Sequence, residues 1–315
     1  MLFALPLRAS LQRFEVGNPA DVAPALHGPI IHMAGGGKDV DAAFQETIDR
    51  VRGCRDCPVK LDVLVLRASG GDGYNNYLQG MNGVDSVTTL VVTDRLSAES
   101  AAVVNAVRNA EYVFFAGGDQ CNYVKLFNGG AVQVELRVLY TRGGAIGGTS
   151  AGMAIQGKAS YDACNDASAQ SALALADPFN DEISFTTDFL DWPDLGNVIT
   201  DTHFAQRNRM GRLFAFIARQ LRESEARDFL GIAANERTAV LVDGRGLAEV
   251  IGEGPAYFVL GDHFPERALP GQSLTYCGFK IWRAPSGLSF DLRHRPATGF
   301  YTVDVNDGVI LRDPY

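Results

Sequence analysis

"AIGGTSAGMAI", residues 145–155, joins a short apolar run to a helix-forming run through a single serine. Residues 148–152 match G-x-S-x-G, the pattern of a nucleophile elbow, in which a strand turns abruptly into a helix. The Ser150 hydroxyl would then stand at a helix N-terminus, and the N–H of Ala151 would face a developing oxyanion. The alternative is a serine that only caps a helix. The apolar run before the serine favours the elbow.

Strands and helices alternate on the N-terminal side of this turn. Apolar, strand-like runs are separated by amphipathic helical runs, and each helix is long enough to cross from one parallel strand to the next. The strands are expected at 29–36, 59–71, 87–94 and 112–120, and the helices at 39–53, 97–110 and 122–142. Continuous apolar strands in this arrangement are typical of a parallel sheet that is covered on both faces. We therefore predict an α/β fold with a three-layer, mostly parallel sheet.

Beyond Asp177 the pattern changes. A strand at 197–204 runs into His203, a helix is expected at 205–226, and short strands separated by polar turns follow over 229–260. No helical periodicity remains after His263. We predict an α/β domain at 1–262 and a β-rich C-terminal extension at 263–315 that packs on it.

Composition narrows the range of partners. The 315 residues carry a net charge of -9, which argues against nucleic acid as the main partner. No apolar run reaches the ~18 residues that a membrane span needs. The opening residues 1–10, MLFALPLRAS, lack a basic n-region and are too short for a convincing signal peptide; the remnant of a trimmed one is the alternative.

The cysteines do not predict a metal centre. Their number is five, which argues against a complete disulfide framework. Cys54 and Cys57 form a CxxC, but no second CxxC or histidine pair accompanies it, so two thiols or one local disulfide are expected. Cys121 is interpreted as a packing residue. We expect neither a metal nor an organic cofactor.

Three glycine-rich segments follow predicted parallel strands, at 67–77, 116–123 and 147–153. Ligands bind outside the carboxyl ends of such strands, so the three segments should meet on one rim. A serine needs a base before it becomes a good nucleophile. Among the five histidines, His203 ends a strand and precedes a helix, so it should reach the same rim.

A third group must orient the imidazole and stabilise its cation. Glu236 lies between two predicted strands and is the preferred acid. Asp201 is the alternative, but residues 201 and 203 of one strand lie on the same face, which leaves the acid little room to reach around. The chain order Ser150, His203, Glu236 differs from that of α/β-hydrolases, where the acid precedes the histidine.

Four ordered motifs resemble a known family. They are FFAGGDQ at 114–120, GGTSAGM at 147–153, TDTHFAQRNRMGRL at 200–213 and GIAANERTAVLVD at 231–243. Together, over roughly residues 28–260, they look like the cyanophycinases, in the peptidase clan that also holds the α-aspartyl dipeptidases. The resemblance implies a homodimeric serine peptidase on a flavodoxin-like α/β sandwich, related to class I glutamine amidotransferases. An amidotransferase itself is disfavoured, because its elbow needs a cysteine at position 150.

The resemblance also implies roles for single residues. Ser150 matches the nucleophile, His203 the base and Glu236 the acid. Gly118 and Ala151 would form the oxyanion hole. The matching substrate-binding positions are Asp119, Gln120, Thr202, Arg207, Arg209 and Arg212.

Two positions depart from family members that cleave cyanophycin. Thr202 stands where they carry glutamine, and Asn235 where they carry aspartate. The segment at 35–77, from GGGKDVDAAF to LRASGGDGYNNY, and Thr202 both resemble a cyanophycinase-like branch that often appears with export signals, which favours an exported or periplasmic location over a cytoplasmic one.

The arginines fit a substrate with carboxylates, since a guanidinium binds a carboxylate through two hydrogen bonds. Arg209 and Arg212 share a helical face. Residues 207 and 209 are about 200° apart on a helix and cannot face one pocket unless the helix starts after 207. A cationic leaving group would need acidic or aromatic partners. The candidates are Asp72, Asp119, Asp166, Tyr74 and Tyr77.

The leading hypothesis is a serine exopeptidase that hydrolyses β-aspartyl-arginine linkages of the cyanophycin type through an acyl-enzyme. Its expected partner is a peptide substrate. A dipeptidase for α-aspartyl or isoaspartyl peptides with the same triad is the alternative. A binding protein of the same fold without turnover is disfavoured, because all three triad positions are present.

Overall fold

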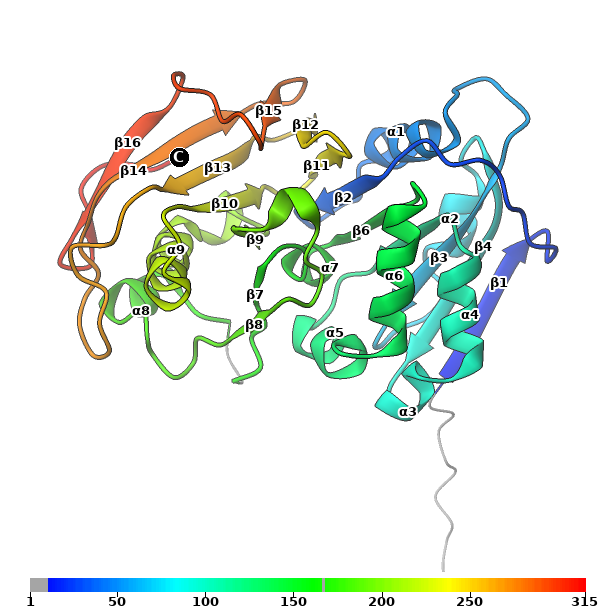
Figure 1. Ribbon diagram of the computed structural model, residues 1–315, viewed down its shortest axis with the longest axis horizontal. Coiled ribbons are helices and arrows are strands. Elements are labelled where there is room, and N and C mark those ends of the chain that lie inside the picture. Colours follow the sequence, from blue (N-terminus) through cyan, green and yellow to red (C-terminus); the bar gives the residue numbers. More distant parts are fainter. Residues whose placement is uncertain (1–10, 166–167) are drawn as a thin grey trace, which may run out of the picture.

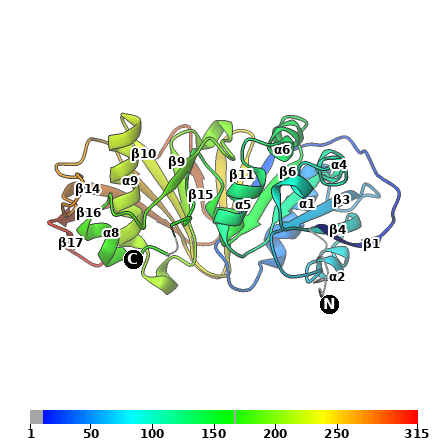
Figure 2. The same ribbon diagram turned by 90° about the horizontal axis from the view of Figure 1, so that it is seen from below.

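The computed structural model describes residues 11–165 and 168–315. The chain forms two sheets that lie side by side (Figure 1). Seen from below, the first sheet and its helices fill one end of the molecule, and the second sheet with helix α9 fills the other (Figure 2). The opening residues 1–10, and with them the prediction about a signal peptide, lie outside the described part.

The first sheet has nine strands. In spatial order they are β1 (Leu11–Gly17), β4 (Val84–Val92), β3 (Leu61–Arg67), β5 (Tyr112–Phe115), β6 (Ala145–Thr149), β2 (Ile30–Ala34), β11 (Thr238–Asp243), β12 (Leu247–Gly252) and β15 (Ser289–Asp291). The five strands from β4 to β2 are parallel to their neighbours. Antiparallel strands flank them on both edges. The predicted parallel sheet is therefore the centre of this one.

Helices cover both faces of the first sheet, as predicted. Along β5, Tyr112 and Phe114 pack toward one face, and Val113 and Phe115 toward the other, because side chains alternate along a strand. Residues of α1 (Asp41–Arg52) and α2 (Asn75–Gln79) join the first group. Residues of α3 (Arg95–Ala98), α4 (Ala101–Asn109), α5 (Gln120–Phe127) and α6 (Ala131–Thr141) join the second.

The helix expected over 122–142 is two helices. The chain leaves α5 at Asn128, and Gly129 adopts φ 70°, a left-handed conformation that glycine reaches without steric cost. Apolar periodicity on both sides of this break hid it from the sequence.

The second sheet was not predicted. Its order is β17 (Val309–Ile310), β16 (Tyr301–Asn306), β14 (Tyr276–Ala284), β13 (Ala256–Gly261), β10 (Phe229–Ala234), β9 (Val198–Asp201), β7 (Ala159–Tyr161) and β8 (Phe185–Thr187). Only the pairs of β9 with β10 and with β7 are parallel among its described strands. The helices α8 (Ser171–Ala176) and α9 (Met210–Ser224) pack on it.

The chain crosses between the two sheets at several points. The short helix α7 (Ala151–Ala154) leads from β6 toward β7, and residues 235–237 lead from β10 to β11. The C-terminal strands also divide, since β14, β16 and β17 extend the second sheet while β15 pairs with β12 of the first. The division at residue 262 stays a prediction.

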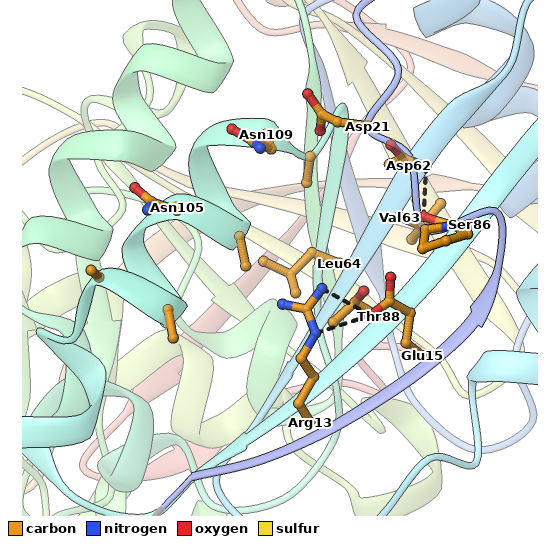
Figure 3. Close-up of a pocket in the computed structure, with 15 residues that line it drawn as sticks. Arg13, Glu15, Asp21, Asp62, Val63, Leu64, Ser86, Thr88, Asn105 and Asn109 are labelled. Carbon is orange, nitrogen blue, oxygen red and sulfur yellow. Dashed lines mark hydrogen bonds and ion pairs between the residues drawn. The ribbon is translucent and has the colours of Figure 1, made fainter.

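A polar pocket lies on the first sheet at the β1 edge (Figure 3). It is formed by β1, β3, β4 and α4, and neither Ser150 nor His203 lines it. Among its lining residues, Arg13 pairs with Glu15, and the Ser86 hydroxyl donates to Asp62 at 2.6 Å. Because these polar groups bind one another and no nucleophile–base pair is among them, the pocket is not the candidate active site.

None of the helices within residues 11–165 and 168–315 is both long and apolar enough to span a bilayer.

We predict that Phe115→Ala lowers the free energy of unfolding by about 3–5 kcal/mol, because it opens a cavity between β5 and α5. Phe115 is fully buried, and its ring lies 5.3 Å from that of Tyr123. Urea denaturation followed by circular dichroism measures the change. Leu96→Ala is the control, because Leu96 is 85% exposed and should change the value by less than about 0.5 kcal/mol. Equal effects of the two substitutions would contradict this account of the core.

Candidate active site

Ser150 lies between β6 and α7 in a strained backbone conformation, with φ 53° and ψ -113°. The two glycines around it permit this turn. A Cβ added to Gly148 would stand 2.5 Å from the carbonyl carbon of Gly152, and one on Gly152 would stand 2.1 Å from the Phe115 oxygen. The chain can therefore turn here only with glycine at both positions. This is the elbow geometry that G-x-S-x-G predicts.

His203 follows β9 and places its ring between two partners. Its Nε2 lies 2.8 Å from the Ser150 hydroxyl, and its Nδ1 lies 2.7 Å from a Glu236 carboxylate oxygen. The His203 side chain is 9% exposed and that of Glu236 is 34% exposed. A hydroxyl, an imidazole and a carboxylate joined in this order can transfer a proton from the hydroxyl to the ring.

Three consecutive carbonyls, at the last residue of β2 and the two residues after it, hold the backbones of these segments. Ala34 accepts the N–H of Ser150 at 3.0 Å, Gly35 accepts that of His203 at 2.7 Å, and Gly36 accepts that of Arg237 at 2.9 Å. Residues far apart in the sequence are thus aligned along one stretch of chain.

Gly36 and Gly37 also let the side chains approach. A Cβ on Gly36 would lie 2.3 Å from Cε1 of His203, and one on Gly37 would lie 3.0 Å from the Cβ of Glu236. Both glycines have positive φ. Sequence reasoning missed these two positions; the run of three glycines at the end of a predicted strand was the available signal.

The pKa of His203 is lowered from its ordinary value of 6.5. Burial is the main cause, the hydrogen bond that the ring donates to Glu236 opposes it, and the cations Arg207 and Arg209 lower the pKa further. At neutral pH the imidazole is therefore neutral and can accept a proton from Ser150.

A cavity of about 360 Å³ opens beside Ser150. It collects every residue that the sequence assigned to the oxyanion hole or to substrate binding: Gly118, Asp119, Gln120, Ala151, Thr202, Arg207, Arg209 and Arg212. The three arginines can share it because α9 begins only at Met210, after a 3-10 turn at Ala205–Arg207. The condition that the helix must start after residue 207 is met.

Arg212 is already engaged by the protein. Its Nε and Nη2 donate to the two carboxylate oxygens of Asp201 at 2.8 and 2.5 Å, and Nη1 donates to the Ser168 hydroxyl at 3.2 Å. Both side chains of the ion pair are buried. Asp201 is therefore the partner of an arginine, and Glu236 is the carboxylate beside His203.

Arg209 is less completely paired. Its Nη1 donates to the carbonyl and hydroxyl of Thr202 at 2.9 and 3.1 Å, and Asp201 lies 3.6 Å away. Burial lowers the pKa of Arg209 to about 10. The cavity walls carry four cations, from Lys125 and the three arginines, against the carboxylates of Asp119 and Asp201. The cavity thus favours an anionic ligand.

The two positions that depart from the family pattern have identifiable contacts. Thr202 holds Arg209, as above. The Asn235 side-chain oxygen accepts the N–H of Ala205 at 2.9 Å, which ties the segment after His203 to the crossing that carries Glu236.

The cysteine at position 121 is not a packing thiol. Cys121 and Cys164 form a disulfide, with 5.0 Å between their Cα atoms, and both line the cavity. The interpretation of Cys121 as a packing residue was wrong, because Cys164 lies 43 positions away and only the fold brings it near. Cys54 and Cys57 form the local disulfide that was one of the two expectations for CxxC.

The residues considered for a cationic leaving group do not gather in one place. Asp119 lines the cavity, whereas Tyr74 and Tyr77 line a separate pocket. Asp166 lies outside the described residues. In the described part of the chain, no group of three or more histidine, cysteine or acidic residues has the arrangement of a metal site.

We predict that Gly36→Ala lowers kcat/KM by at least about 10²-fold, because the added methyl group would displace the His203 ring. Gly196→Ala is the matched control, since Gly196 has φ -64° and nothing within 4 Å of the added Cβ. Steady-state kinetics and a thermal melt of both variants check the result. A folded Gly36→Ala protein with the wild-type rate would show that this contact does not position the ring.

The pH profile should follow His203. With His203 as the general base only the neutral ring can accept a proton, so kcat/KM should fall as the pH drops through the pKa of His203, and the apparent pKa of this acid limb should lie below 6.5. Arg207→Gln removes a cation that lowers this pKa, so the limb should move to higher pH. An acid limb above 6.5 in the wild-type protein, or a downward movement in the variant, would contradict the electrostatic description.

Comparisons with known proteins agree with the motifs. No family model matches the chain. It is 32% identical to a cyanophycinase of Synechococcus elongatus over 178 residues, which cover 56% of this chain and 50% of the relative. It is 30% identical over 179 residues to a cyanophycinase of Nostoc sp. (strain PCC 7120), covering 56% of this chain and 54% of the relative. The chain thus spans about half the length of these curated relatives.

The fold has a counterpart among solved structures. The crystal structure of a peptidase from an acI-B1 Actinobacterium matches with a TM-score of 0.57 and 15% identity, over 85% of this chain and 98% of that one. At this identity the match speaks for the fold alone. Together with the sequence matches, it makes this chain a relative of the cyanophycinases with the fold of a known peptidase.

Proposed function

We propose that this protein is a serine peptidase of the cyanophycinase type. Ser150 is the nucleophile, His203 the general base and Glu236 the acid that orients the imidazole. One observation carries the proposal: the Ser150 hydroxyl, the His203 ring and the Glu236 carboxylate are joined by hydrogen bonds of 2.8 and 2.7 Å.

The reaction would follow the acyl-enzyme route. The Ser150 oxygen attacks the carbonyl carbon of the scissile bond while its proton passes to Nε2 of His203. Glu236 stabilises the imidazolium, and the N–H groups of Ala151 and Gly118 hold the oxyanion. The intermediate collapses as His203 gives the proton to the leaving amine. Water then enters, gives a proton to His203 and attacks the acyl ester, which releases the acid and restores Ser150.

The substrate is proposed from the charge of the cavity. Its walls carry more cations than carboxylates, and Arg209 is buried with only a shared carboxylate, so an aspartyl carboxylate would complete its pairing. Arg207, which is exposed, could meet a second carboxylate. We propose a peptide with β-aspartyl-arginine units, as in cyanophycin, and an exopeptidase mode of cleavage.

A dipeptidase for α-aspartyl or isoaspartyl peptides is the second candidate. It shares the triad and the need for an aspartyl carboxylate. The observation that favours it is Thr202, which binds Arg209 where cyanophycin-cleaving relatives would carry glutamine.

The proposal extends to fold type and assembly. The five parallel strands from β4 to β2, covered by helices on both faces, support a flavodoxin-like description akin to class I glutamine amidotransferases. The strands after residue 262 would be an extension of that domain. A homodimer is expected by analogy with the family, and light scattering at several protein concentrations tests it.

Loss of the nucleophile should abolish turnover. We expect Ser150→Ala to lower kcat by about 10⁴ to 10⁶-fold with an unchanged melting temperature.

Glu236→Gln should lower kcat far more than Asp201→Asn does, because only Glu236 contacts the imidazole. Asp201→Asn should instead lower the melting temperature, since it leaves buried Arg212 without its counter-charge. Ser150→Ala retaining a tenth of the activity, or the reverse order of the two acids, would reject the triad.

The substrate is identified by incubation with cyanophycin beside β-Asp-Arg, β-Asp-Lys, α-Asp-Arg and α-Asp-Leu. Mass analysis of the products shows which bond is cut. We expect β-aspartyl-arginine material to react best, and Arg209→Ala to lower kcat/KM strongly because the substrate carboxylate loses its partner. Ser150→Ala is the control for contaminating peptidases. If an α-aspartyl peptide is the best substrate, the dipeptidase replaces the cyanophycinase assignment.

A further inference from the structure

We propose that the Cys121–Cys164 disulfide is a positioning element of the catalytic cavity: it locks together two cavity walls that belong to different sheets, so that substrate binding depends on its oxidised state. The inference rests on the proposed function for its kinetic readout. It concerns a covalent tie that the mechanism above does not use.

Cys121 belongs to the first sheet's side of the cavity. It lies in the first turn of α5, and its N–H donates to the Asp119 carboxylate that caps this helix, at 2.9 Å. Two residues on, the Tyr123 hydroxyl lies 2.7 Å from the Ala116 carbonyl and 3.3 Å from that of Leu66. This wall, which includes Gly118, is therefore fixed to the parallel strands beside Ser150.

Cys164 belongs to the second sheet's side. It follows β7, and its N–H donates to the carboxylate of Asp162 at 3.0 Å. Asp162 also accepts the hydroxyls of Ser184 and of Thr186, the latter at 2.8 Å. The turn that carries Cys164 is thus fixed to β8, and it has no peptide connection to α5 shorter than the 43-residue separation of the two cysteines.

A noncovalent link across the same boundary is weaker than the disulfide. The Gln120 side chain donates to the Tyr161 carbonyl at 3.3 Å, near the upper limit for such a bond. Gln120 is also a proposed substrate contact. Without the disulfide, this hydrogen bond between α5 and the end of β7 would remain, and it is one for which substrate can compete.

The wall beyond Cys164 holds the arginines. The Ser168 hydroxyl lies 3.4 Å from Nη2 of Arg209 and 3.2 Å from Nη1 of Arg212, and the Ala169 carbonyl accepts from Arg212 at 3.3 Å. Cys164 and Ser168 line the same cavity as Arg209, so a displacement of this wall would alter the position of the arginine that is proposed to bind substrate. The backbones of the triad segments are held by hydrogen bonds to the carbonyls of residues 34–36. The disulfide takes no part in these bonds.

The second disulfide provides a matched control. Cys54 and Cys57 are three positions apart, follow the C-terminal cap of α1 at Gly53, and are not among the cavity-lining residues. The exposed Cys277 is the free cysteine of the described chain. Removing the Cys54–Cys57 pair changes the thiol count as removal of the Cys121–Cys164 pair does, without altering the cavity.

The redox step is thiol–disulfide exchange with a dithiol reductant. The Cys121–Cys164 S–S bond accepts two electrons and two protons and becomes two thiols. The dithiol loses the same electrons and protons and becomes its own disulfide. Reoxidation reverses the exchange, so the change in substrate binding should be reversible.

The test compares the wild-type chain, Cys121→Ser/Cys164→Ser and Cys54→Ser/Cys57→Ser. We expect the Cys121/Cys164 variant to raise KM by about tenfold or more while kcat changes by less than about threefold, because binding groups move and the triad does not. Dithiothreitol should reproduce this change in the wild-type chain, reoxidation should reverse it, and the reagent should add nothing in the variant. The Cys54/Cys57 variant should match wild type.

A fluorophosphonate probe reports on Ser150 without any substrate. Equal labelling of wild type and the Cys121/Cys164 variant, beside a raised KM, supports a positioning role. A KM within twofold of wild type in both the variant and the reduced chain overturns the proposal. If kcat and labelling collapse together, the bond supports the triad or the fold rather than the substrate cavity, and the proposal also fails.

Failure of the proposed function is distinguishable. If the wild-type chain cleaves none of the peptides and is not labelled, the peptidase assignment fails. Hydrogen exchange of residues 159–165 then tests the positioning role of the disulfide without any substrate. Faster exchange after reduction, with exchange in β2 and β6 unchanged, supports this role. Unchanged exchange at 159–165 overturns it.

Discussion

The carbonyls of Ala34, Gly35 and Gly36 are the constraint on which the site depends. They accept the N–H groups of Ser150, His203 and Arg237 in order, at 3.0, 2.7 and 2.9 Å. A side chain can rotate away from a partner, but a backbone hydrogen bond fixes the chain itself, so these three bonds set where the hydroxyl, the ring and the carboxylate begin. Strain at Ser150 can persist because the surrounding bonds over-determine its conformation.

The two buried arginines of the cavity differ in role: one stabilises the cavity wall and the other is free to bind a ligand. Asp201 neutralises Arg212 through two short hydrogen bonds, and breaking such a pair would leave an unpaired charge at a cost of about 3–5 kcal/mol. Arg209 shares that carboxylate only at 3.6 Å and relies on neutral oxygens for the rest. One arginine therefore holds the cavity wall in place, and the other keeps the capacity to bind an anion.

The site lies between the two sheets, and several kinds of interaction therefore hold its residues together. Its residues come from the ends of β5, β6 and β9 and from the crossing between β10 and β11, so relative movement of the sheets would separate them. Backbone hydrogen bonds to residues 34–36 hold the segments of Ser150, His203 and Glu236, the Asn235 amide holds the segment after His203, and the Cys121–Cys164 disulfide holds the far wall of the cavity.

The sequence by itself determined the parallel strands, the helices on both faces and the turn at Ser150, because periodicity and G-x-S-x-G record local geometry. It also selected His203 and Glu236, and the structure places His203 against Ser150 and Glu236 against His203. The second sheet, the Asp201–Arg212 pair and the Cys121–Cys164 bond were decided only by the tertiary structure. Each depends on contacts between segments that are far apart in the sequence. Neither the spacing nor the type of the residues indicates which of these segments will pack against each other in the fold.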